Sequence, residues 1–454
     1  MRQNNSPWLH NIDKNRALVT MNGTVFTDIA IIGGGIAGMS TAYMLLKNTT
    51  HKITLIEGSK VAHGATGHNA GYAVAEFEKS FKDIVSEYGL DNARHGLAEY
   101  EDAFTIFQNI CSEIGLKVPE KIKSFVAYSS QEHFLDTLHE EYLKYGELKS
   151  EIYLLKDSHW SKDIPENMLS KISFLEIEEM YKILGTNKKS LKFFQAVIVN
   201  HIAVSNSAIF TERLAAYLLE KYPNRFAIYE NTFINSIRLL QNNRVILDSL
   251  YGVCMSDKVV LCTNGFENFD IYGPYNMKID KEFHHNVSGL IGYMIGTFTK
   301  SDESKDGGGV FYEEGYKHKN HPVDAGPYIY YTRRHFEYGL ENGELFCVGG
   351  PEVKLHDRRL YKKDHEVDEK IYSDMEDFQK DIFSINAQPT FKWHGLMGYT
   401  KTGIRIVGRD VRFVDLFYNL GCNGIGLIPS IAGARRLARI IGGEKLPKSI
   451  FDPR

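Results

Sequence analysis

The sequence has few cysteines, no strong excess of either charge and no apolar run that approaches the roughly 18 residues of a membrane span. Its 454 residues include five scattered cysteines and no CxxC pair, which argues against a disulfide framework or a zinc ribbon. The net charge is only −4, so neither a nucleic acid nor a membrane surface is expected as a partner. The N-terminal segment is polar and lacks the apolar core of a signal peptide. These absences predict a soluble, reduced, cytoplasmic protein without a transmembrane segment.

The chain does have enough apolar residues, 43%, for a full core, and its length favours two domains. Its first part predicts a βαβ unit. Residues 28–32 form a short apolar run typical of a buried parallel strand, a glycine-rich turn follows, and good helix formers occupy 39–46. The second strand is expected at 51–58.

Farther along, apolar residues recur at helical spacings and form one stripe, which consists of Leu97, Phe104, Phe107, Cys111 and Ile114. Residues 196–222 predict a strand, a turn and a helix. Additional strands are expected at 258–266, 289–297 and 326–334. A glycine loop at 419–426 leads into a helix from about 430 to 441. The glycines of 306–309 follow no strand, so this stretch is interpreted as a surface loop and not as a second dinucleotide site.

Gly33, Gly35 and Gly38 form a GxGxxG motif between the first strand and its helix. Glycine at these positions allows a tight turn, close approach of the backbone to a pyrophosphate, and close packing of helix on strand. The first helical residues, Ile36 and Ala37, then direct N–H groups toward the phosphates.

An acidic residue completes this motif. Glu57 ends the second strand 19 residues after Gly38, and with Gly58 it is placed to bind ribose hydroxyls. Its negative charge disfavours the additional phosphate of NADP. The context therefore predicts a binding site for an adenine dinucleotide.

The octapeptide GATGHNAG at 64–71 suggests which dinucleotide is bound. Residues with little or no side chain permit flat packing of backbone against a large ring, and here they are Gly64, Ala65, Gly67, Ala70 and Gly71. Thr66 and Asn69 can form hydrogen bonds to phosphate or to the ring edge. A second loop of this kind, directly after the acidic strand end, favours FAD over NAD.

These motifs resemble the D-amino-acid oxidase superfamily of FAD-dependent oxidoreductases, the glycine and sarcosine oxidase-like group. PWLHN and GYAVAEF, on either side of the first motifs, are most similar to its γ-glutamylputrescine oxidase-like branch. LCTNG at 261–265, WHGLMGYTKTGIRIVG at 393–408 and NLGCNGIG at 419–426 resemble later parts of its FAD domain. The resemblance implies that the flavin is contacted by Thr263, Gly265, Gly395, Gly424, Ile425 and Gly426.

His68 occupies a position where the resembling branch usually carries arginine, and Thr66 replaces its serine. Three interpretations stay open. In the dimethylglycine and sarcosine dehydrogenase branch, a histidine at the corresponding place carries FAD covalently. In the L-2-hydroxyglutarate oxidase branch, Thr-Gly-His-Asn holds flavin without such a bond, and Asn69 favours this interpretation over the first. In the third, His68 simply substitutes for arginine.

The C-terminal glycine loop is the candidate for stabilising the negative N1/O2 edge of reduced flavin, because a helix N-terminus follows it. Cys422 in this loop is interpreted as a small buried residue rather than a covalent anchor. The sarcosine oxidase-like pattern has a substrate-binding lysine where this chain has Ile428. Because isoleucine carries no charge, this position cannot bind a substrate carboxylate as that lysine does.

The alternating strand 328–334 supplies the candidate substrate residues. One face carries Tyr328, Tyr330 and Arg334, and the other carries Ile329, Tyr331 and Arg333. Tyr331 with Arg333 could clamp a substrate carboxylate, and Tyr330 with Arg334 is the mirror choice. His394 is expected to be structural. His284 and His285 have no carboxylates at ligand spacing, so no metal site is expected.

Together these features predict an α/β fold in which a Rossmann-like FAD-binding domain accompanies an α+β substrate domain that has its own sheet. The predicted FAD-binding stretches are 25–115, 196–275 and 390–454, and the substrate stretches are 116–195 and 276–389. The expected reaction is oxidation of a C–N bond of an amine or amino acid, with hydride transfer to flavin N5 and reoxidation by dioxygen or another acceptor. The alternatives are a 2-hydroxy acid oxidase or dehydrogenase and a flavin-binding protein without catalysis.

Overall fold

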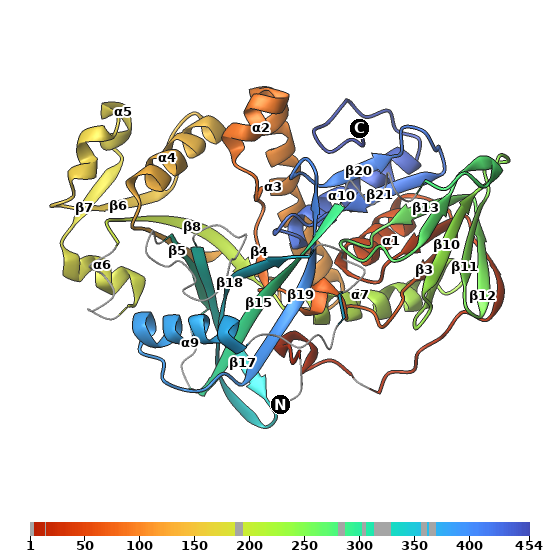
Figure 1. Cartoon of the computed structure of the whole chain (residues 1–454), viewed down its shortest axis with the longest axis horizontal. Helices are drawn as coiled ribbons and strands as arrows, with labels where there is room; N and C mark the ends of the chain where they lie inside the picture. Colours follow the sequence, from red (N-terminus) through yellow and green to blue (C-terminus); the bar gives the residue numbers. More distant parts are fainter. Residues whose placement is uncertain are drawn as a thin grey trace.

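The structure is a computed structural model that describes residues 4–13, 15–186, 194–279, 287–301, 306–312, 328–355, 361–362 and 369–454. His284 and His285 lie outside the described residues. Three sheets and the helices around them make up the described chain, and segments from its start, middle and end lie side by side at one end of the molecule (Figure 1).

A six-stranded sheet has the order β20-β21-β13-β2-β3-β9. Five of its strands are parallel neighbours, namely β2 (Ile29–Ile32), β3 (Ile53–Ile56), β9 (Phe226–Tyr229), β13 (Lys258–Leu261) and β21 (Leu416–Leu420). The edge strand β20 (Ile406–Arg409) is antiparallel. Every residue of β2 and β3 is buried, as strands of a covered parallel sheet require. This sheet confirms the predicted Rossmann-like unit.

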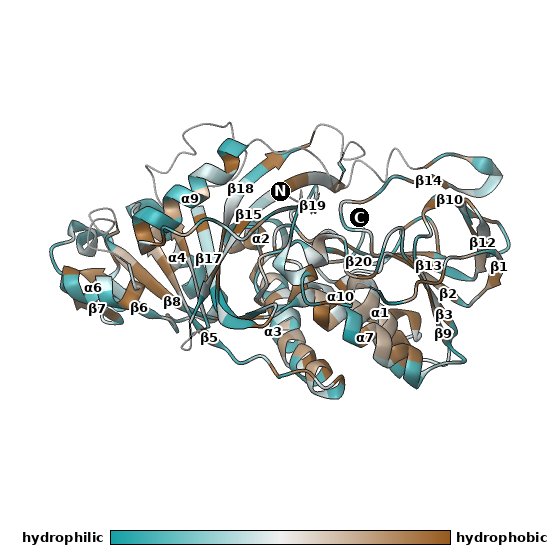
Figure 2. Ribbon diagram, turned by 90° about the horizontal axis from the view of Figure 1, so that it is seen from below, coloured by the Kyte–Doolittle hydropathy of each residue, from teal (hydrophilic) through white to brown (hydrophobic). Residues whose placement is uncertain are grey.

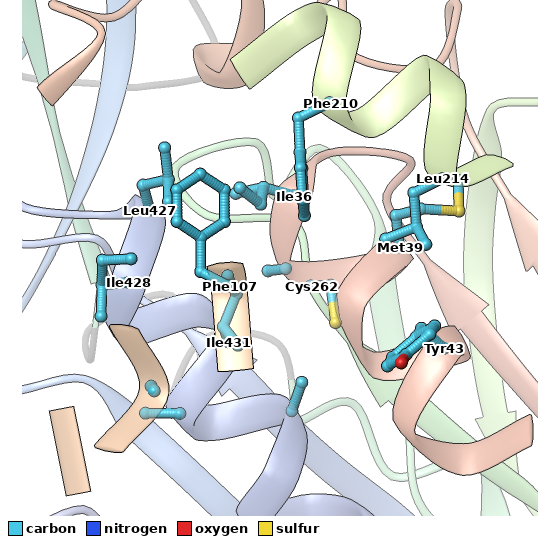
Figure 3. Packing of buried hydrophobic residues seen from close by; sticks show 14 of the residues in the cluster. Ile36, Met39, Tyr43, Phe107, Phe210, Leu214, Cys262, Leu427, Ile428 and Ile431 are labelled. Carbon is cyan, nitrogen blue, oxygen red and sulfur yellow. The ribbon is translucent and has the colours of Figure 1, made fainter. Parts of the chain in front are cut away.

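Four helices pack together beside this sheet: α1 (Ile36–Asn48), α3 (Leu90–Glu113), α7 (Ser207–Lys221) and α10 (Leu427–Ile441). Figure 3 shows the side chains of this shared core, in which Ile36 of α1 lies among Phe107 of α3, Phe210 of α7 and Leu427 of α10. Figure 2 shows α1, α7 and α10 at the centre of the molecule. The predicted apolar stripe of α3 is buried apart from Ile114 at its end, and α10 begins slightly earlier than expected.

A five-stranded sheet extends the same end of the molecule. Its order is β1 (Gly23–Phe26), β12 (Gly252–Ser256), β11 (Val245–Ser249), β10 (Ile234–Leu239) and β14 (Asp270–Tyr272).

A ten-stranded sheet forms the rest of the core. Its path runs through β19 (Phe391–Thr400), β15 (Val287–Lys300), β18 (Glu341–Lys354), β17 (Tyr328–Tyr338), β16 (Gly307–Tyr312), β5 (Ile122–Tyr128), β8 (Ala196–Val204), β6 (Glu151–Leu155) and β7 (Ile172–Leu175), and β4 (Tyr72–Ala73) pairs with β8. The helices that accompany it are α2 (Phe81–Tyr88), α4 (Gln131–Tyr145), α5 (Glu166–Leu169), α6 (Ile177–Leu184) and α9 (Glu369–Phe383), the last of which packs on β15 and β18. Both β8 and β19 belong to this sheet, although their residues fall in stretches assigned to the FAD-binding domain.

Residues 306–309 were expected in a surface loop, and this prediction is wrong for the glycines. They open β16, which lies between β17 and β5 in the ten-stranded sheet. A Cβ on Gly309 would lie 2.6 Å from the ring of Tyr331 and 2.7 Å from the carbonyl oxygen of Phe125. Glycine is therefore present because an aromatic ring crosses the strand there, not because the chain turns.

No helix in the described part of the chain combines the length and apolar character that a membrane span requires.

Candidate active site

A cavity of about 1030 Å³ lies where the six-stranded and ten-stranded sheets meet. This volume is at the upper end of the roughly 300–1,000 Å³ of ordinary ligand pockets, so it has room for a large cofactor together with a small substrate. Its walls come from the GxGxxG turn, the end of β3, the 64–81 segment, the turn after β13, the loop before α10 and one face of the ten-stranded sheet.

The GxGxxG turn lies at the cavity wall, where β2 ends and α1 begins. Gly33 has a φ of +108°, and a Cβ there would lie 2.6 Å from the carbonyl oxygen of Cys262. A Cβ on Gly38 would lie 1.9 Å from the carbonyl oxygen of Gly33. Glycine is therefore required for the turn and for close packing. The turn places Gly35, Ile36 and Ala37 along the cavity, where the α1 N-terminus favours negative charge.

Glu57 lines the cavity at the end of β3, and backbone groups hold its carboxylate in place. Its Oε2 accepts a hydrogen bond of 2.7 Å from the N–H of Gly34, and its Oε1 accepts one of 2.8 Å from the N–H of Ser59. Gly58 lies beside it at the wall. The carboxylate thus adjoins the GxGxxG turn, where a ribose next to a bound pyrophosphate would lie.

The 64–71 loop is tied to its surroundings by its own polar groups. The hydroxyl of Thr66 accepts a 2.9 Å hydrogen bond from the N–H of Ile36, at the start of α1. Ser207 Oγ donates to the carbonyl of Thr66 at 2.7 Å, and the Asn69 amide donates to the same carbonyl at 2.9 Å. The N–H of Gly71 donates to the Asn69 side chain. In this structure the side chains of Thr66 and Asn69 thus fix the loop.

The N-terminal PWLHN segment packs behind this loop. Trp8 Nε1 donates to the carbonyl of Asn69 at 2.5 Å. A Cβ on Gly67 would lie 2.6 Å from the side chain of Leu9, so glycine is needed on this side as well. Ala65, Ala70 and Gly71 complete the loop, whose other side faces the cavity except at Gly67.

His68 is half-buried at the cavity wall. Its Nδ1 lies 2.9 Å from the carbonyl oxygen of Gly64 within the same loop. A Cβ on Gly395 would lie 2.5 Å from the His68 carbonyl oxygen, so glycine in β19 allows this close approach. This position is compatible with each of the three interpretations of His68.

The turn after β13 meets the C-terminal loop. The buried Thr263 lines the cavity, and its hydroxyl oxygen has no hydrogen-bond partner among the described residues. Asn264 Oδ1 accepts hydrogen bonds from the N–H groups of Cys422, at 3.0 Å, and Gly398. Gly265 packs tightly against Leu396 and Met397 and does not line the cavity.

The C-terminal loop reverses direction through left-handed backbone at Gly421, Asn423 and Gly424 before α10 begins. Gly424, Ile425 and Gly426 line the cavity, so the α10 N-terminus faces it. Burial raises the pKa of the Cys422 thiol, which disfavours the reactive thiolate. The glycine turns, the two helix N-termini and the unpartnered Thr263 hydroxyl fit a bound dinucleotide.

Side chains alternate between the two faces of the strand at 328–334, as predicted. The candidate substrate residues therefore do not all face the cavity. Tyr328 and Tyr330 line the cavity. Tyr331 stacks on Phe346 on the opposite face of the sheet, and Arg333 forms an ion pair of 3.3 Å with Glu344.

Arg334 is buried behind the 64–71 loop. Its guanidinium stacks 4.5 Å above the ring of Trp8 and donates to the carbonyls of Ser205 and Gly71. The structure therefore does not bring Tyr331, Arg333 or Arg334 to the cavity.

Several carboxylates that were not predicted also line the cavity, and two of them, Glu78 and Glu352, lie at its aromatic wall. The hydroxyl of Tyr328 donates to Glu78 at 3.0 Å, and the hydroxyl of Tyr399 lies 3.5 Å from Glu352. Burial and the nearby charge of Glu78 raise the pKa of Glu352 to about 7. No sequence motif marked either residue.

The fold and the cavity together fit the class of proteins that bind an adenine dinucleotide in a Rossmann-like unit. The chain matches the family described as FAD dependent oxidoreductase (DAO) over residues 28–440. It belongs to that family, as the sequence resemblance predicted.

Curated relatives are distant. A Bacillus subtilis protein named as a Rieske 2Fe-2S iron-sulfur protein, YhfW, is 23% identical over 278 residues, which cover 61% of this chain and 48% of that protein. The γ-glutamylputrescine oxidoreductase of Escherichia coli is 32% identical over 75 residues, 16% of this chain and 17% of that one. The matches thus span about half or less of the length of these relatives.

Solved structures show the same fold at low identity. Glycine oxidase from Geobacillus kaustophilus has a TM-score of 0.65 at 14% identity and covers 94% of this chain and 97% of its own. L-Proline dehydrogenase from P. horikoshii has a TM-score of 0.66 at 14% identity, with 96% and 98% covered. L-α-Glycerophosphate oxidase from Mycoplasma pneumoniae, with FAD bound, has a TM-score of 0.60 at 15% identity, with 93% and 97% covered.

Proposed function

We propose that this chain oxidises a C–N bond of an amine or amino acid, with dioxygen or another acceptor as the final oxidant. Bound FAD would supply the hydride acceptor, its N5 atom. The observation that carries the proposal is one continuous cavity that joins the dinucleotide-type glycine turns to an aromatic wall on the ten-stranded sheet. Amino acid oxidases and dehydrogenases among the structural neighbours support it.

The chain's own residues would position the cofactor. The GxGxxG turn and Glu57 would hold the adenylate half, and the loop 64–71 with Gly395 would hold the ring system at the cavity wall. The N-terminus of α10 would stabilise negative charge that develops at the ring edge. A covalent bond between His68 and FAD would be detected by the acid precipitation described below.

The cavity wall would prepare the substrate. An amine must be neutral before its neighbouring C–H bond can release hydride. Tyr328 and Tyr330 line the cavity, and their rings would desolvate a bound ammonium group and so lower its pKa. The reaction then needs positioning more than it needs a dedicated general base.

An anaerobic absorbance screen tests the proposal. Purified yellow protein is mixed with amines, amino acids and 2-hydroxy acids, and loss of the oxidised flavin spectrum is followed. Reduction by an amine or amino acid is expected. Reduction by hydroxy acids alone would instead establish a 2-hydroxy acid oxidase or dehydrogenase, and no reduction would establish a flavin-binding protein without this catalysis. Acid precipitation of the same sample reports on His68, because covalently attached flavin stays in the pellet.

A further inference from the structure

Tyrosines and two carboxylates form a continuous wall along the cavity. Four tyrosines and Glu352 line it from four neighbouring strands of the ten-stranded sheet, in the order Glu352 (β18), Tyr330 and Tyr328 (β17), Tyr312 (β16) and Tyr128 (β5). The ring centroids of Tyr128 and Tyr312 lie 5.4 Å apart, those of Tyr312 and Tyr328 5.7 Å, and those of Tyr328 and Tyr330 6.3 Å. Glu78 reaches this wall from the segment after the 64–71 loop.

Neither Glu78 nor Glu352 forms an ion pair with any cation in the part of the chain that the structure describes. Their polar contacts there are the hydroxyls of Tyr328 and Tyr399. Two of the lysines that line the cavity form ion pairs with other carboxylates: Lys144 pairs with Glu76 at 2.7 Å, and Lys79 pairs with Glu87. Glu78 and Glu352 carry like charge on one wall of the cavity, so a cation bound beside them would relieve their mutual repulsion.

The tyrosine wall lacks the groups that were expected to clamp a substrate carboxylate, and the guanidinium of Arg405, which lines another part of the cavity, donates to oxygens of Asn419 and Gly421. The arginines expected to clamp one lie elsewhere: Arg333 pairs with Glu344 on the opposite face, and Arg334 is buried against Trp8. Ile428 stands in place of a substrate-binding lysine and is fully buried in α10.

We propose that Glu78, Glu352 and the tyrosine wall bind a second ammonium group of the substrate, so that the chain acts on short diamines or polyamines and not on α-amino acids. This inference rests on the proposed amine oxidation at the same site. Carboxylates would supply charge-assisted hydrogen bonds to the ammonium group, and the tyrosine faces would supply cation–π attraction. The raised pKa of Glu352 accords with a pair that lacks a cation and would fall when one binds.

Isothermal titration calorimetry on the FAD-loaded protein tests this inference with three ligands of equal chain length. They are 1,5-diaminopentane, n-pentylamine and 5-aminopentanoate, which differ only in the group at the far end. We expect the diamine to bind at least about tenfold more tightly than either of the others. E352Q should weaken diamine binding about tenfold and change pentylamine binding less than twofold, and E78Q should act in the same direction.

Glu341→Gln is the matched control, because Glu341 lies on the same strand, β18, but is exposed at its hairpin end. It should bind all three ligands as the unmodified protein does. Equal affinity for the diamine and the monoamine, or diamine affinity that is unchanged in both E352Q and E78Q, would overturn the inference.

Flavin reduction separates this inference from the proposed function. Reduction by pentylamine without any preference for the diamine would overturn the second-ammonium site and leave amine oxidation standing. Selective, Glu352-dependent diamine binding without reduction by any amine would overturn amine oxidation and support the cation site.

Discussion

At the scale of single residues, Gly33 is a position in the cofactor cradle that only glycine fits. A substitution there combines left-handed backbone strain, on the order of 1–3 kcal/mol, with overlap against the Cys262 carbonyl oxygen 2.6 Å away. We expect Gly33→Ala to be purified with little or no flavin. The flavin-to-protein absorbance ratio measures this directly.

Gly443→Ala is the control for that prediction. Gly443 also has left-handed backbone, with φ of +91°, but a Cβ there would meet nothing within 4 Å. It therefore carries the strain without the overlap and without contact to the cavity, and its flavin content should equal that of the unmodified protein. Equal flavin loss in both variants would show that Gly33 has no specific role in the cradle.

The raised pKa of Glu352 predicts how the free energy of unfolding depends on pH. Its pKa is raised from 4.5 to about 7, so between these values the folded protein binds more protons than the unfolded chain. This contribution to stability is present at low pH and is lost as pH rises through about 7. The melting temperature of E352Q should therefore increase relative to that of the unmodified protein between pH 5 and pH 8. A difference that does not vary with pH would contradict the assignment.

The residues that could be predicted from the sequence belong to short local motifs. Gly33 and Gly38 are needed by the turn in which they lie, so their spacing was enough to predict it. Glu78 and Glu352 are separated by more than 270 positions in the sequence. No local pattern could show that they face one cavity, because the arrangement of β18 beside β17 decides it.

At the scale of elements, the N-terminus of α1 depends on the 64–71 loop. Thr66 accepts a hydrogen bond from the N–H of Ile36, which has no partner within the helix. Thr66→Val keeps the shape and removes the acceptor, and loss of such a cap costs about 1 kcal/mol. We expect a lower melting temperature and, since the loop and the helix both line the cavity, an FAD dissociation constant raised about fivefold.

Thr211→Val provides the comparison. Thr211 is also buried, but it does not line the cavity, and its hydroxyl donates to the Ser207 carbonyl within α7 rather than capping α1. Its FAD affinity should be unchanged in a fluorescence titration of the apoprotein. If Thr66→Val binds FAD as tightly as Thr211→Val, the loop does not support the cofactor through this hydrogen bond.

Elements with a strong periodic signal were predicted well. β2, α1 and β3 occur as expected, and so does the alternating strand β17. β16 was missed because glycine ordinarily marks turns, whereas Gly309 accommodates the ring of Tyr331 from a strand distant in sequence.

At the scale of the whole molecule, the cavity depends on elements from the start, middle and end of the chain meeting at one place (Figure 1). The fold class was predicted from the two ends of the chain. The membership of β8 and β19 in the ten-stranded sheet was not, because an apolar strand has the same sequence pattern in either sheet. The direction in which each tyrosine faces depends on that membership.

The central claim is that this composite cavity binds FAD, and the cofactor content of the purified protein tests it most directly. The protein is incubated with excess FAD, desalted and digested with protease, and both released and peptide-bound flavin are quantified by chromatography. The account predicts roughly one FAD per chain, as expected for a single dinucleotide fold. A folded protein that retains no flavin after this treatment would contradict it.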